Sequence, residues 1–185
     1  MKTIKLLSIL FFSAVLFTAC SDEDPIPVLE EEMITNVNLT FTNAADANDK
    51  VVLSNVAPNG QDGTSTYNVE GKFKTGATYS LTLELLNGDE DVLTEDIIPE
   101  AAEHFFWFKV NGINLTMTRD NDDTIGSGGS KLGVKTTWVA GAVSSGNVQI
   151  ALIHEPDSTD DSNEWGTVQG GSEDINLTFT GVKIE

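Results

Sequence analysis

The segment Val37-Asn38-Leu39-Thr40-Phe41-Thr42 decides the fold class, because its apolar and polar side chains alternate without interruption. Successive side chains of a β-strand point to opposite faces of a sheet, so this alternation predicts a strand with one buried face. The same alternation recurs at residues 79–85, 148–152 and 175–179. Shorter strand-like runs follow at residues 51–53, 67–73, 105–110, 115–118 and 134–139. The chain is therefore predicted to consist mainly of β-strands.

Turn signals separate these runs, among them Asn87-Gly88 and Asn111-Gly112. Glycine and asparagine tolerate the positive φ angles that tight hairpins require. Short strands at this spacing predict an all-β fold, an antiparallel immunoglobulin-like β-sandwich of about eight strands. One short helical segment is expected at residues 99–104, since Pro99 suits a first helical position and good helix formers follow it.

The N-terminal residues have the pattern of an export signal. Lys2 and Lys5 precede an apolar run at residues 6–17, and Thr18-Ala19-Cys20 follows. This order predicts a signal peptide at residues 1–19, and the apolar run is short for a membrane-spanning helix. Cys20 is the one cysteine of the chain, and residues 17–20 resemble a lipobox, so we expect Cys20 to be lipidated. An ordinary secretory signal beside a free thiol is the alternative.

Residues 20–33 are acidic, contain two prolines and lack apolar periodicity, so they are expected to form a flexible tether. Residues 34–185 are long enough for a single β-sandwich domain with a core of its own. Ser21-Asp22-Glu23-Asp24-Pro25 resembles the acidic export signal of Bacteroidota-type surface lipoproteins. That resemblance implies a lipid-anchored protein of the outer membrane that faces the cell exterior.

The net charge of the chain limits the kinds of molecule that it can be expected to bind. Removal of Lys2 and Lys5 with the signal peptide would leave 8 of the 10 basic residues against 29 acidic ones, a formal charge of −21. Nucleic acids and anionic lipids are bound largely through Lys and Arg contacts to phosphate, so both are disfavoured as partners. Cations and basic partners remain, although acidic residues also commonly serve only to solvate a surface.

The candidate metal ligands are Glu100, Glu103, His104 and His154. On a helix the first three side chains would share a face, and imidazoles combined with carboxylates suit Zn²⁺ or Cu²⁺. His154 ends the strand-like run that begins at Val148 and is expected to join them. Two alternatives stay open: a haem held by both histidines, and a Ca²⁺ site in the acidic loops at residues 120–126 or 157–161, although Lys131 stands where an EF-hand needs glutamate.

Catalytic signatures are absent from the sequence. It contains no G-x-S-x-G elbow, no H-E-x-x-H pair and no phosphate-binding P-loop. Arg119 is the one arginine, which leaves no set of arginines to clamp a phosphorylated substrate. We therefore expect a protein that is not an enzyme.

Several segments resemble a family of small Bacteroidota-type lipoproteins that accompany TonB-dependent outer-membrane receptors and are sometimes labelled type 1 periplasmic binding fold superfamily proteins. The resemblance lies in Leu86-Asn87, residues 94–100, Glu103-His104-Phe105-Phe106, His154-Glu155-Pro156-Asp157 and Asp174-Ile175. That label implies alternating strands and helices, which the alternating strand pattern of this chain does not support.

The resemblance implies an accessory that binds a ligand, such as a metal or metal complex, for an uptake receptor. A structural or adhesive surface protein without a small-molecule ligand is the alternative.

Overall fold

The computed structural model describes residues 32–60 and 63–185. The expected signal peptide, Cys20 and residues 20–31 of the expected tether lie outside the described residues. Within the described part of the chain, no helix is both long and apolar enough to cross a membrane.

The larger of the two main sheets has the strand order β3-β2-β1-β4-β8-β7, with β5 paired to β4, and every pairing in it is antiparallel. Its strands are β1 (Asn36–Asn43), β2 (Asp46–Val56), β3 (Thr66–Glu70), β4 (Thr78–Asn87), β5 (Glu90–Asp91), β7 (Leu115–Arg119) and β8 (Thr136–Ala140). Buried and half-buried residues alternate through the whole of β1, as its sequence predicts.

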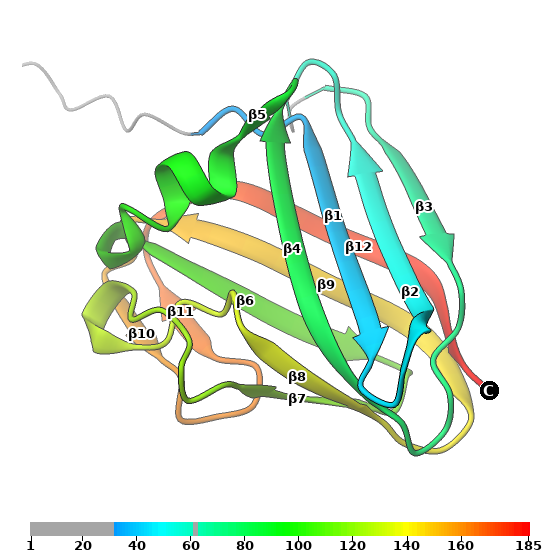
Figure 1. Cartoon of the computed structure of the whole chain (residues 1–185). Coiled ribbons are helices and arrows are strands. Elements are labelled where there is room, and N and C mark those ends of the chain that lie inside the picture. The colour runs from blue at the N-terminus through cyan, green and yellow to red at the C-terminus, as the bar shows by residue number, and fades with distance from the viewer. Residues whose placement is uncertain (1–31, 61–62) are drawn as a thin grey trace, which may run out of the picture.

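The smaller sheet has the antiparallel order β12-β9-β6. Its strands are β6 (His104–Asn111), β9 (Ser144–His154) and β12 (Ser172–Ile184). A separate hairpin pairs β10 (Ser158–Asp160) with β11 (Thr167–Gln169). Figure 1 shows the sheets as two layers, with β1, β2 and β4 in front of β6, β9 and β12.

An aromatic cluster joins the two layers. The ring of Phe41 on β1 meets Trp138 on β8 edge-on, with centroids 5.2 Å apart, and Trp138 meets Phe108 on β6 at 5.7 Å. All three side chains are fully buried, and each such pair contributes roughly 0.5–1.5 kcal/mol beyond area burial. The predicted all-β sandwich is confirmed. It has twelve described strands rather than about eight, and the extra ones include the short β5, β10 and β11.

The expected helical segment at residues 99–104 is shorter than predicted. A 3-10 turn, η2 (Ala101–Glu103), follows a π-helical turn, η1 (Leu93–Ile97), and a second 3-10 turn, η3 (Ser127–Gly129), lies later in the chain. His104 already has extended backbone angles, φ −122° and ψ 155°, because it begins β6. The expectation that Glu100, Glu103 and His104 share a helical face is therefore wrong.

A bulge in β12 positions one further polar residue. Glu173 pairs with Ile153 and Ile175 pairs with Leu152, so Asp174 is an extra residue in the ladder. Regular alternation would bury only one of two neighbouring residues, yet Asp174 and Ile175 are both buried. The bulge therefore turns a carboxylate inward, as bulges often do near functional sites.

Candidate metal centre

His104 and His154 are direct neighbours across two strands. His104 begins β6, His154 ends β9, and the two residues are partners in the antiparallel register. Side chains of directly opposed residues lie on the same face of a sheet, and these two imidazoles stack with centroids 4.7 Å apart and an interplanar angle of 16°. Figure 1 shows this end of β6 and β9 beside the helical turns η1 and η2. The two histidines predicted as metal ligands therefore lie side by side.

The orientation of His104 is fixed by the backbone. Its Nδ1 lies 3.0 Å from the carbonyl oxygen of Glu100, which can only accept a hydrogen bond, so Nδ1 carries a proton. In the neutral imidazole this leaves the lone pair on Nε2. A histidine whose other nitrogen donates to a carbonyl is arranged as metal-binding histidines commonly are.

Two carboxylates face the histidine pair. Oε1 of Glu32 lies 3.3 Å from Nε2 of His104, and Oε2 of Glu32 lies 3.7 Å from Nδ1 of His154. Oδ2 of Asp174 lies 3.8 Å from Nε2 of His104. These four side chains, which we call the inner cluster, can each place one ligand atom within 4.8 Å of all the others.

The inner cluster is buried, and three polar atoms of its histidines and Glu32 have no hydrogen-bond partner. The side chains of His104 and Asp174 are 0% exposed, that of His154 is 9% exposed and that of Glu32 is 13% exposed. Nε2 of His104, Nδ1 of His154 and Oε2 of Glu32 are buried without a hydrogen-bond partner. Buried polar atoms nearly always have partners, because leaving one unpaired costs roughly 1–3 kcal/mol. Three such atoms on residues whose ligand atoms can lie within 4.8 Å of one another suit a shared cation.

Electrostatics in the cluster favour the charged forms. Burial alone would lower the pKa of His104, but the Glu32 carboxylate, the Glu100 carbonyl and the charge of Asp174 outweigh burial and raise this pKa above its usual value. Burial would raise the pKa of Glu32, yet His104, a backbone N–H and His154 together hold it below the ordinary value. His104 and Glu32 thus each favour the charged form of the other.

The geometry fits a small tetrahedral ion. Zn²⁺ binds histidine nitrogen and carboxylate oxygen at about 2.0–2.2 Å, which places neighbouring ligand atoms of a tetrahedron about 3.3–3.6 Å apart. Nε2 of His104 lies 3.3 Å from Oε1 of Glu32 and 3.8 Å from Oδ2 of Asp174, close to that value, and all four residues can place a ligand atom within 4.8 Å of the others. Two imidazoles and two carboxylates are a ligand set that suits Zn²⁺ or Cu²⁺ better than Ca²⁺, which prefers oxygen ligands throughout.

The second nitrogen of His154 faces a different carboxylate. Its Nε2 lies 3.6 Å from Oε2 of Glu103, whose side chain is 52% exposed. Glu103, His154 and Glu155 form a second group with ligand atoms within 4.8 Å of one another, which we call the outer group. The N–H of Glu155 donates to the carbonyl oxygen of Glu103 at 2.6 Å, which joins the end of β9 to the end of η2.

Of the four predicted ligands, His104 and His154 lie together in the inner cluster, whereas Glu103 meets His154 only in the outer group. Glu100 is exposed and belongs to neither group. Its backbone carbonyl accepts the hydrogen bond that orients His104. Sequence reasoning missed Glu32 and Asp174 as members of the inner cluster. Glu32 falls in the expected tether, and Asp174 directly precedes the alternating run at residues 175–179, whose parity places it on the polar face. The stacked imidazoles also leave no space for a haem macrocycle between their nitrogens.

The acidic loops considered for Ca²⁺ have protein partners. The carboxylate of Asp123 accepts hydrogen bonds from the N–H groups of Thr124, Gly133 and Lys135, and Asp122 pairs with the ammonium of Lys135. Asp161 accepts a hydrogen bond from the N–H of Lys131. The carboxylates of Asp122, Asp123 and Asp161 therefore stabilise these loops through bonds to the protein itself.

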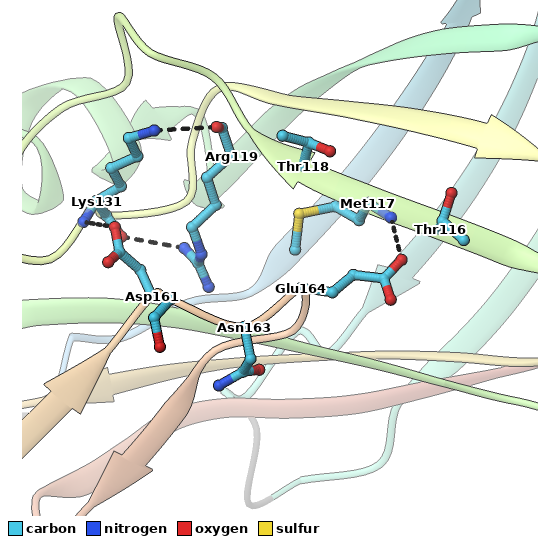
Figure 2. A pocket seen from close by; sticks show the side chains of 9 residues that line it. Thr116, Met117, Thr118, Arg119, Lys131, Asp161, Asn163 and Glu164 are labelled. Atoms are coloured by element: carbon cyan, nitrogen blue, oxygen red, sulfur yellow. Dashed lines mark hydrogen bonds between the residues drawn. The ribbon is translucent and has the colours of Figure 1, made fainter.

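A pocket of about 430 Å³ lies along β7 and is lined by both basic and acidic side chains. Figure 2 shows that its polar groups bind one another: Glu164 accepts a hydrogen bond from the N–H of Met117, and Lys131 donates to the carbonyl of Arg119. The Arg119 guanidinium donates to three backbone carbonyls and lies 4.5 Å from the Phe105 ring centroid. The pocket walls are thus tied together internally.

Relatives of known function would give an independent test of this assignment. Comparison with family models, with curated proteins and with solved structures found no match to this chain.

Proposed function

We propose that the protein binds one divalent transition-metal ion, with Zn²⁺ as the best match, in the inner cluster of Glu32, His104, His154 and Asp174. One observation carries the proposal: two buried imidazoles direct Nε2 and Nδ1, both without hydrogen-bond partners, at the same Glu32 carboxylate. The role assigned is binding rather than catalysis.

The ligand set supports a resident or captured ion rather than a reaction. Four protein ligands would complete the tetrahedral shell of Zn²⁺, and a closed shell is typical of sites that hold the ion without activating water. The exposed surface is strongly acidic as well, with 29 acidic residues in the chain, which favours the approach of cations.

The cellular role proposed for this binding rests on the N-terminal sequence and on the family resemblance. The signal-like residues and Cys20 indicate a lipid anchor, and the resemblance to Bacteroidota-type lipoproteins implies an outer-membrane protein that would present its metal ion to a TonB-dependent uptake receptor. Membrane fractionation of Cys20→Ala tests the anchor: the variant should be released from the membrane fraction. Retention of this variant would remove the anchor from the proposal and leave the metal site untouched.

Calorimetric titration with Zn²⁺, Cu²⁺ and Ca²⁺ in high salt tests the metal site. We expect one tight site per chain for Zn²⁺ or Cu²⁺, and no tight phase in the double variant His104→Ala with His154→Ala. High salt screens diffuse attraction to the acidic surface but largely spares direct coordination. Circular dichroism of each variant verifies the β-fold. Equal tight binding by the parent and the folded double variant would overturn the proposal.

A further inference from the structure

His154 presents its two ring nitrogens to two different groups of carboxylates. Nδ1 lies in the inner cluster, 3.7 Å from Glu32, while Nε2 lies 3.6 Å from the exposed Glu103. His104 offers only one nitrogen, because its Nδ1 is held by the Glu100 carbonyl. His154 is therefore the one residue shared by the inner cluster and the outer group.

Burial restricts how an ion can reach the inner cluster. His104 and Asp174 have fully buried side chains, so an ion must pass one of the two ligands that keep some exposure, Glu32 or His154. Only His154 also belongs to the outer group, where Glu103 and Glu155 are exposed. The His154 side chain is more than nine-tenths buried, and its buried Nδ1 has no hydrogen-bond partner.

We propose that Glu103, His154 and Glu155 form a transit site through which the divalent ion enters and leaves the inner cluster. This inference rests on the proposed function. The arriving ion would bind the two exposed carboxylates and Nε2 of His154 while Nδ1 carries the ring proton. On moving inward the ion would leave Nε2 and bind Nδ1, with the Nδ1 proton released to solvent and Nε2 taking up a proton from water. In the loaded state Nε2–H faces Glu103, so the carboxylate then orients the ring.

A transit site changes rates rather than the final equilibrium. Two exposed carboxylates raise the local concentration of cations at the entrance and lower the barrier to both entry and exit. Their removal should slow both steps together. A purely orienting role for Glu103 predicts something different, namely faster release with an unchanged entry rate.

Stopped-flow absorption with Co²⁺ as the probe distinguishes these cases, because tetrahedral Co²⁺ has strong visible bands when bound. The test variant is Glu103→Gln with Glu155→Gln. The matched control is Asp46→Asn with Glu70→Gln, which removes the same charge at exposed positions of β2 and β3, outside both groups. We expect the entry rate constant of the test variant to fall about tenfold or more relative to the control, with one ion still bound.

An entry rate equal to that of the control would overturn the transit site while leaving the inner site intact. Two tightly bound ions per parent chain would also overturn it, because the outer group would then be a resident site. If the parent binds no ion in calorimetry, the proposed function fails and the transit site fails with it, so the two failures are distinguishable.

Discussion

His104 and His154 are cross-strand partners whose stacked rings, 4.7 Å apart, direct Nε2 of one and Nδ1 of the other at the same Glu32 carboxylate. The residues are 50 positions apart in the chain, and the β6–β9 register brings them together. The antiparallel ladder thus supplies the geometry that a metal site requires, while the Glu100 carbonyl fixes which His104 nitrogen faces inward.

Zn²⁺ is expected to stabilise the folded protein, because it binds the assembled cluster and not the dispersed ligands of the unfolded chain. At a free concentration one hundred times Kd, binding contributes about 2.7 kcal/mol. For a chain of this size that corresponds to a rise in Tm of roughly 5–10 °C. Thermal unfolding with Zn²⁺ and then with excess chelator measures this shift. An unchanged Tm would contradict occupancy of the buried cluster.

The metal-free protein should have a pH window of added stability from the His104–Glu32 pair. The raised pKa of His104 gives stability that is present at low pH and lost as pH rises through the folded-state pKa, above the usual 6.5. The lowered pKa of Glu32 gives stability that is lost as pH falls through its folded-state value, below 4.5. Urea unfolding from pH 3 to 9 measures the window, and Glu32→Gln should flatten it. A parent profile identical to that of Glu32→Gln would refute the pairing.

The variants Glu32→Gln and Glu100→Gln test whether Zn²⁺ binds the inner cluster or the ligand set predicted from the sequence. Glu32→Gln removes a carboxylate charge from the inner cluster, so the affinity for Zn²⁺ should fall by about tenfold or more. Glu100→Gln keeps the backbone carbonyl that orients His104 and should leave the affinity within about twofold, since its exposed side chain is in neither group. Competition titration with a chelating dye measures both. The reverse order would contradict the assignment of Glu32 to the metal site.

Arg119→Lys tests the role of the buried guanidinium in the fold. Arg119 donates to the carbonyls of Phe106, Lys131 and Trp165, and burial lowers its pKa to about 10 although Asp123 and Asp161 act in the opposite direction. A lysine cannot reach three carbonyls at once, so we expect a loss of more than about 2 kcal/mol in urea unfolding. Lys183→Ala, at an exposed position, should change stability by less than about 0.5 kcal/mol. Comparable losses in both variants would contradict this role.

The sequence predicts the strands well, because alternation depends on local order. Val37 to Thr42 lies within β1, and the run from Val148 continues to His154 at the end of β9. The histidines could be identified as candidate ligands since they are the two in the chain. The remaining ligands depend on long-range pairing. Asp174 turns inward only because a bulge interrupts β12, and no local pattern specifies where a bulge occurs.

Glu32 could not be identified for a related reason. It lies among acidic residues and prolines whose composition is typical of a tether, and its role arises from contact with residues more than 70 positions away. The η2 turn likewise ends one residue earlier than its composition suggests, because the ladder between His104 and His154 extends β6 to its first residue. In each case tertiary pairing overrides the local preference.

X-ray absorption spectroscopy of the Zn²⁺-loaded protein tests the central claim most directly, because it reports the atoms bound to the ion. We predict a four-coordinate ion with two imidazole nitrogens and two carboxylate oxygens at about 2.0–2.2 Å. The multiple-scattering features of imidazole should disappear in the folded His104→Ala, His154→Ala variant. A first shell made only of oxygen in the parent protein, without imidazole scattering, would contradict the assignment of the inner cluster as a metal site.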